Sequence, residues 1–163
     1  MLEMLRAHGL VAGPTQRPWL AGAAAGAVAD LPALALLAGF GTLAKLAAAA
    51  GASLPTVALL HGGAMVVGGV LYGLLFQRAA NDAAGGWLFG IAYGFLLWLV
   101  AAVPLLQWLA PKPVVVGLLA IGLFLGQLLW GLVLGLTFKY IHRPLQSGLD
   151  GQIPSAAGDA RAR

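Results

Sequence analysis

The sequence predicts an all-α integral membrane protein, a bundle of four transmembrane helices. Of its 163 residues, 61% are hydrophobic and only 9% are charged, and the mean hydropathy is +0.92. Soluble domains carry about 25% charged residues. Four apolar stretches, near 19–40, 57–76, 87–109 and 114–138, are long enough to cross the hydrocarbon core of a bilayer, which takes about 20 residues of helix. Because backbone groups in hydrocarbon must find partners within the chain, these stretches must be helices.

The first span begins after an arm of residues 1–18, which we expect to be cytoplasmic. Arg17-Pro18-Trp19 marks its start, since proline favours the first turn of a helix and Trp and Arg anchor helices at the membrane interface. The segment 42–51 is still helix-prone but carries Lys45. We expect it to extend the first helix or to lie in the interface.

The remaining spans follow from similar boundaries. Ser53-Leu54-Pro55 precedes the second span, which ends at Gln77-Arg78 before a loop of small and polar residues. The third span runs from Trp87 to near Trp108, and a short Pro-Lys-Pro connection leads into the fourth. Beyond residue 142 the chain is polar and rich in small residues. We therefore predict a bundle over 19–142 and a disordered cytoplasmic tail over 143–163.

Positive charge predicts the orientation of the spans. With four spans, both termini and the middle loop share one side, which holds seven basic residues, whereas the other side holds only Lys45 and Lys112. Lys and Arg concentrate on the cytoplasmic side. Both termini are therefore expected to be cytoplasmic. The net charge of +4 is explained by these flanking residues and does not indicate nucleic acid, and the absence of cysteine excludes disulfides and thiolate metal sites.

An internal repeat is visible. VGGVLYGLLFQR (67–78) aligns with LWGLVLGLTFKY (129–140) at an offset of 62, and Gly22 and Gly26 align with Gly86 and Gly90 at an offset of 64. This pattern predicts two copies of one helical hairpin, both the same way up, as in parallel-repeat membrane proteins. A chance alignment of Gly- and Leu-rich spans is the alternative.

Glycines spaced four apart mark one face of each span. Small residues let membrane helices approach closely and gain van der Waals contact. These faces are expected to pack the four helices together, or to mediate self-association where a face stays outside. The predicted packing glycines are Gly22, Gly26, Gly69, Gly73, Gly86, Gly90, Gly94, Gly122, Gly126, Gly131 and Gly135.

Asp30 is the most unusual residue, because it falls roughly 16 Å into the first span. A carboxylate at that depth is costly and points to a function and a partner. His61 is the candidate partner, and Gln127 could hydrogen-bond across helices. These three residues are candidates for binding a ligand or proton. The alternative is a buried structural hydrogen bond that fixes one helix against the next. No catalytic residues, metal site or cofactor are predicted.

The Gly/Ala-rich first span (AGAAAGAVAD), the histidine of His61-Gly62-Gly63 and the aromatic-glycine pairs at Tyr72-Gly73 and Trp130-Gly131 resemble a loose group of uncharacterised small bacterial inner-membrane proteins with four helices. The resemblance covers the spans only and implies a fold and a bacterial inner (plasma) membrane location. That group has no agreed activity, and Asp-Leu-Pro in the first span departs from it.

Three functions compete. The first is a structural or accessory subunit that packs through Gly-rich faces against a larger membrane complex or itself. The second is a small oligomeric transporter or channel that uses Asp30 and His61. The third, an enzyme acting on lipid or quinone, is least favoured because catalysis needs more positioned polar groups. The expected partners are the lipid bilayer, a second copy of the chain or other membrane subunits.

Overall fold

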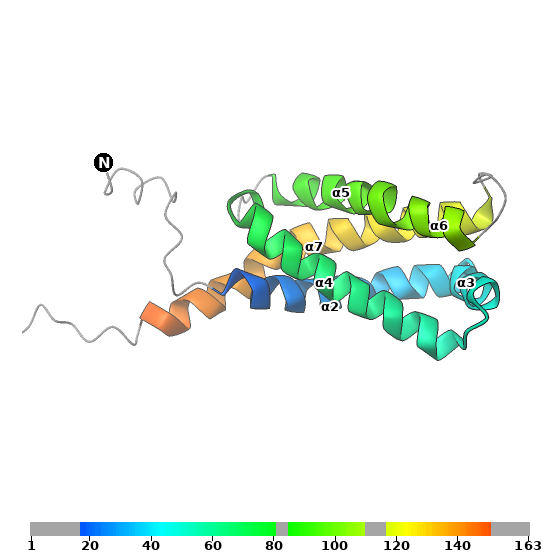
Figure 1. Ribbon diagram of the computed structural model, residues 1–163. Coiled ribbons are helices and arrows are strands. Elements are labelled where there is room, and N and C mark those ends of the chain that lie inside the picture. Colours follow the sequence, from blue (N-terminus) through cyan, green and yellow to red (C-terminus); the bar gives the residue numbers. More distant parts are fainter. Residues whose placement is uncertain (1–16, 81–84, 110–116, 151–163) are drawn as a thin grey trace, which may run out of the picture.

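The computed structural model describes residues 17–80, 85–109 and 117–150, and every element in these ranges is a helix (Figure 1). The order along the chain is α2 (Pro18–Gly39), α3 (Thr42–Ala50), α4 (Leu54–Ala80), α5 (Gly86–Leu97), the π-helical η1 (Trp98–Ala102), α6 (Val103–Leu109) and α7 (Leu118–Asp150).

Four helical segments are long and apolar enough to cross a membrane, with mean hydropathies from 1.8 to 2.1: Pro18–Gly39, Leu54–Phe76, Gly86–Trp108 and Leu118–Arg143. Their outward faces carry large apolar side chains, such as Leu59 and Trp108, which are 77% and 80% exposed. Surfaces of this kind are unfavourable in water and suit lipid as the solvent. The prediction of an all-helical, multi-pass membrane protein is confirmed.

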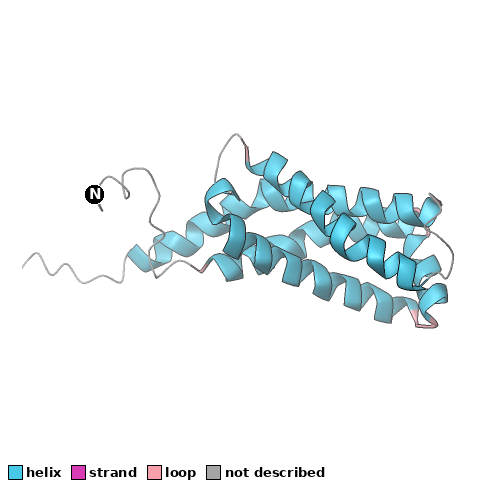
Figure 2. Cartoon of the chain, turned by 45° about the horizontal axis from the view of Figure 1, so that its top comes forward, coloured by secondary structure: helices cyan, strands magenta, loops and turns pink. Residues whose placement is uncertain are grey.

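Helices α2 and α7 form the centre of the bundle, although they come from opposite ends of the described chain. Helix α4 lies beside α2, and α5 beside α7 (Figure 1), and Figure 2 shows the same bundle of helices from a second direction. Burial agrees with this arrangement, since 44% of the spanning window is buried in α2 and in α7, against 28% in α4 and 22% in α5. The two outer helices therefore present most of the lipid-facing surface.

The α2–α4 pair packs through glycine. A Cβ placed on Gly69 would overlap the Gly22 carbonyl oxygen and lie 2.9 Å from the Gly26 Cα, and one placed on Gly73 would overlap the Pro18 carbonyl. The backbones of the two helices thus touch directly. In lipid the hydrophobic effect does not drive helices together. Close approach of this kind stabilises their association through van der Waals contact instead.

The α5–α7 pair makes the same kind of contact. The carbonyls of Gly86 and Gly90 lie against Gly135 and Gly131, and Gly94 lies against the Gln127 carbonyl. By these contacts Gly86 occupies the position of Pro18, and Gly90 that of Gly22. The pairing of Gly22 with Gly86 expected from the sequence is therefore one helical turn out of register. Glycines recur every turn on both helices. A sequence alignment therefore cannot decide whether Gly22 corresponds to Gly86 or to Gly90.

Helix α3 is a separate element, because the chain turns at Gly41, which has a φ of +64°. Only glycine adopts this conformation without cost. We expect Gly41→Ala to destabilise the protein by about 1 kcal/mol. Gly39→Ala is the matched control, since a Cβ at this helical glycine meets nothing within 4 Å. Reversible unfolding in mixed micelles would measure both, and equal effects would contradict the argument.

The third span is interrupted by a π-helical turn at Trp98–Ala102, which was not expected. Pro104 follows it. Proline has no N–H to donate and its ring collides with the carbonyl four residues earlier, so the preceding turn widens. The wider turn is closed by the Val103 N–H, which bonds to the Trp98 carbonyl.

The C-terminal prediction of disorder from residue 143 is wrong as far as Asp150, because α7 continues to that residue. Ile141 and Leu145, one turn apart, pack against the buried core and explain why the helix persists. The predicted tail over 151–163, the arm over 1–16 and Lys112 lie outside the described residues.

Two apolar clusters fill the bundle. The first, here called the aromatic cluster, includes Ala21, Ala25, Ala29, Ala33, Met65, Tyr72, Tyr93, Trp130, Leu134 and Phe138. The second, the leucine cluster, includes Leu37, Leu43, Leu46, Leu106, Ala120 and Leu123, with Leu34, Val57, Trp98 and Leu119 packed against it. Both clusters take residues from all four spans, so the border between them crosses the whole bundle.

Candidate functional site

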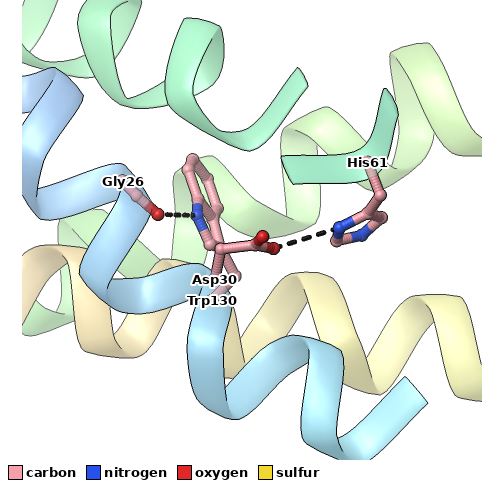
Figure 3. A network of polar contacts seen from close by, with 4 residues as sticks. All are labelled: Gly26, Asp30, His61 and Trp130. Carbon is pink, nitrogen blue, oxygen red and sulfur yellow. Dashed lines mark hydrogen bonds and ion pairs between the residues drawn. The ribbon is translucent and has the colours of Figure 1, made fainter. Parts of the chain in front are cut away.

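Asp30 of α2 and His61 of α4 meet at this border (Figure 3). The His61 Nδ1 lies 3.0 Å from the Asp30 Oδ1, and the two side chains are 12% and 7% exposed. The atoms are at ion-pair distance but lack the alignment of a directed hydrogen bond. The structure thus joins the two residues that the sequence had singled out, inside the spanning part of the bundle.

Glycine brings the pair together. Asp30 follows Gly22 and Gly26 along the face of α2 that touches α4. On α4, Gly62 stands next to His61, and a Cβ placed on it would lie 3.2 Å from the Asp30 Oδ2. The close packing of these two helices buries the whole of Asp30, backbone and side chain together, to 5% exposure.

Trp130 supports the turn that carries Asp30. This side chain is fully buried, and its Nε1–H donates a hydrogen bond of 3.1 Å to the Gly26 carbonyl (Figure 3). In a helix that same carbonyl accepts from the N–H of Asp30, four residues on. Trp130 therefore ties α7 to the turn of α2 from which Asp30 projects. It also packs against Gly68 of α4 and Tyr93 of α5.

Two tyrosines link the outer helices in the same way, and the sequence reasoning missed them. The Tyr93 hydroxyl donates to the Gly68 carbonyl at 2.8 Å, and the Tyr72 hydroxyl donates to the Gly86 carbonyl at 3.3 Å. Glycine leaves its carbonyl uncovered, so a second donor can reach it. The sequence does contain a feature that could have identified them: a Tyr or Trp deep in an apolar span needs an acceptor for its O–H or N–H.

Gln127 does not join Asp30 and His61. It lies on the stripe of α7 that faces α5, with its backbone carbonyl against Gly94, and it is 7% exposed. Its Oε1 accepts no hydrogen bond within the described residues. The structure therefore places this candidate on the other helix pair, at a similar level of the bundle.

The predicted packing glycines all face other helices of the same chain. Nine contact each other, Pro18, Met65, Trp87 or Gln127 across the α2–α4 and α5–α7 pairs, and Gly73 also approaches Phe138 of α7. Gly122 lies against Thr42 and Gly126 against Leu37. Among the glycines of the described spans, Gly39 and Gly63 meet nothing within 4 Å. Self-association through the predicted faces would require surfaces that the bundle already uses.

His142 is buried, although it stands at the last residue of the bundle predicted over 19–142. It is 1% exposed and stacks on Phe138, with ring centroids 5.3 Å apart. The reason is the continuation of α7, which carries the histidine along the face that packs against the bundle.

Removing the Asp30 carboxyl tests its structural contribution. We expect Asp30→Ala to lower the free energy of unfolding by about 1–3 kcal/mol, because it leaves the buried imidazole of His61 without its partner. Asp30→Asn is the matched control: it keeps the shape and an oxygen acceptor, and should cost less than half as much. Unfolding in mixed micelles is the measurement, and an unchanged Asp30→Ala variant would show that the pair does not hold α2 to α4.

No protein-family model, curated protein or solved structure matches the chain. The resemblance to bacterial four-helix proteins therefore stays a hypothesis. The helices and their apolar surfaces establish a small multi-pass membrane protein with a buried carboxylate–imidazole pair.

Proposed function

We propose that the chain is a structural or accessory subunit that docks within the membrane on a larger complex or on a second copy of itself. The observation that carries this proposal is the apolar surface of α4 and α5, where Leu60, Leu75 and Leu88 are among the large exposed side chains. The interior, in contrast, is filled by the two clusters. A packed interior leaves no room for the passage of ions or solutes, whereas large apolar outer surfaces favour docking to other membrane helices.

The proposed setting is the inner membrane of a bacterium, with both termini in the cytoplasm. Lys45 lies on α3 at one end of the bundle, whereas Arg17 begins α2 at the opposite end, where Lys139 and Arg143 also lie. This distribution supports the orientation by the positive-inside rule. Tags fused to the two termini, tested for protease access from either side, would check it.

We further propose that the two helix pairs derive from duplication of one hairpin. The matching glycine contacts of α2–α4 and α5–α7 support this. Parallel duplication would relate the two pairs by a pseudo-twofold axis along the membrane normal.

Gentle detergent extraction followed by identification of co-purifying chains tests the docking proposal. We expect stoichiometric association with foreign subunits or a homo-oligomer. Leu60→Trp on α4 and Leu96→Trp on α5 add bulk to exposed positions without touching the core, so at least one should release the partner. A monomer that co-purifies with nothing, or a partner indifferent to both variants, would contradict the proposal.

A second candidate, a small oligomeric transporter or channel, is favoured by one observation: the Asp30–His61 pair in the spanning region. Ionisable residues at such depth commonly mark ion or proton paths. Because Trp130 and Tyr72 are fully buried in the centre, a path would need more than one copy. Proton flux into liposomes that disappears in Asp30→Asn would support this function, and flux unchanged by that variant would exclude a coupling role for Asp30.

A further inference from the structure

We propose that the end of the bundle at which α2 begins is a binding surface for an anionic phospholipid, and that Arg17 and Arg143 hold the lipid phosphate. Lys139 adds to the positive charge of this surface. The proposal concerns the lipid around the chain rather than a protein partner, so it goes beyond the docking function and does not depend on it.

Positive charge is concentrated at this end of the described chain. Five Lys or Arg residues fall in the described ranges, and four of them stand here: Arg17 at the start of α2, Arg78 in the last turn of α4, and Lys139 and Arg143 on α7. The fifth, Lys45 of α3, lies at the opposite end (Figure 1). An anionic ligand is therefore attracted to one end of the bundle only.

Contacts through α4 bring the basic segments of α2 and α7 together. A Cβ placed on Gly73 would overlap the Pro18 carbonyl oxygen and would lie 3.2 Å from the ring of Phe138. Pro18 and Phe138 therefore approach the same point of α4. Arg17 directly precedes Pro18, and Lys139 directly follows Phe138.

Helix α7 extends this surface outward. Lys139 and Arg143 are four residues apart, so they share one face of the helix. Figure 1 shows α7 running past the start of α2, and Arg143 lies within about two helical turns of Phe138. The Lys139 Nζ lies 5.0 Å from the centroid of the Tyr140 ring, which is exposed. Arg17 and Arg143 are exposed as well, so a headgroup can approach them.

Exposed aromatic rings place these cations at the depth of lipid headgroups. Trp19 follows Arg17 and is 50% exposed, and Trp87 at the start of α5 is 41% exposed at the same end. Tyr140 lies between the two cations of α7. Trp and Tyr are enriched where the hydrocarbon meets the headgroups. Leu136, one turn inward from Tyr140, is also exposed, so acyl chains find apolar surface directly below the headgroup.

No carboxylate of the described residues lies at the level of Arg17 and Arg143. The acidic positions in the described ranges are Asp30, which pairs with His61 inside the bundle, and Asp150, which stands roughly 10 Å beyond Arg143 along α7. A phosphate diester supplies the missing negative charge, and a guanidinium binds phosphate oxygens in a two-pronged arrangement. Anionic lipids are abundant in the cytoplasmic leaflet, which this end faces in the proposed orientation.

Native mass spectrometry of the full-length protein in detergent micelles tests the proposal, because it resolves the binding of single lipid molecules. We expect phosphatidylglycerol to bind more tightly than phosphatidylcholine, whose headgroup has no net charge. Arg17→Gln and Arg143→Gln should each weaken the binding of phosphatidylglycerol about fivefold and leave that of phosphatidylcholine unchanged. Added salt should reduce the preference for phosphatidylglycerol.

Lys45→Gln is the matched control, because it removes the same charge from an exposed position at the other end of the bundle. Equal binding of the two lipids by the wild type, or an equal loss in Lys45→Gln, would overturn the proposal. Displacement of the lipid by glycerol 3-phosphate, which has no acyl chains, would identify free phosphate as the ligand and would overturn it too. Circular dichroism checks the fold of each variant, and Arg143→Gln alone decides if Arg17→Gln does not fold.

Discussion

Replacing Trp130 with alanine is expected to lower the free energy of unfolding by about 3–5 kcal/mol, the cost of emptying a large buried aromatic site. Trp130 is fully buried, donates to Gly26 of α2, and packs on Gly68 of α4 and Tyr93 of α5. The substitution therefore removes contacts with three helices at once. Because it empties the centre of the bundle, we expect the largest effect of any single change considered.

Two matched variants separate packing from hydrogen bonding. Trp130→Phe keeps most of the volume and loses the bond to Gly26, so it should cost about 1 kcal/mol. Trp108→Ala removes the same type of side chain from a site that is 80% exposed and should be nearly neutral. Circular dichroism during unfolding in mixed micelles measures all three without relying on tryptophan fluorescence. A Trp130→Ala variant as stable as Trp108→Ala would refute the central position of Trp130.

The second large effect is expected for Gly69→Ala. A Cβ at this position would overlap the Gly22 carbonyl oxygen and lie 2.9 Å from the Gly26 Cα. Both are backbone atoms of α2, which cannot turn aside as a flexible side chain can. The α2–α4 pair must therefore separate, with a cost of about 1–3 kcal/mol or more. Separation would also lengthen the distance between Asp30 and His61, one to two turns away.

Gly63→Ala is the matched control, because it lies in the same helix and a Cβ there meets nothing within 4 Å. It should be neutral or slightly stabilising, since alanine is the better helix former. Unfolding in mixed micelles would measure the stability of both variants. The distance between spin labels on α2 and α4 would measure the helix separation. If Gly69→Ala were as stable as Gly63→Ala, with an unchanged helix separation, the backbone contact would be absent in the membrane.

The spans could be predicted because lipid restricts the choices so severely. Twenty apolar residues with interfacial Trp, Arg and Pro at their ends leave the backbone only the helix. The spans predicted to start near 19 and 57 begin at Pro18 and Leu54 in the structure. What the pattern cannot supply is the order of helices in space. Four apolar rods of similar length can be arranged in several ways, and the central position of α2 and α7 depends on which glycine faces touch.

The Asp30–His61 contact could be predicted because a sequence shows how deep each residue lies in its span. It also shows that both residues lie on glycine-rich faces of their helices. Gln127 was grouped with them as a polar residue on a small face of its helix, but that face packs against Gly94 of α5 and not against α2 or α4. The tyrosine and tryptophan bonds to glycine carbonyls are long-range contacts, so nothing local to Tyr72 or Trp130 identifies the acceptor. The π-helical turn had a local signal, because Pro104 lies inside the third span. The prediction of one uninterrupted helix there did not take this proline into account.

The central pairing of α2 with α7 has a consequence for biosynthesis. The α2–α4 hairpin can assemble as soon as both segments leave the translocon, and α5–α7 can do the same later. The face of α2 that contacts α7 nevertheless stays uncovered until the last of the four spans has been synthesised. Ribosome-stalled intermediates ending before Leu118 should therefore be captured by insertases or membrane chaperones, and should be degraded when these are depleted.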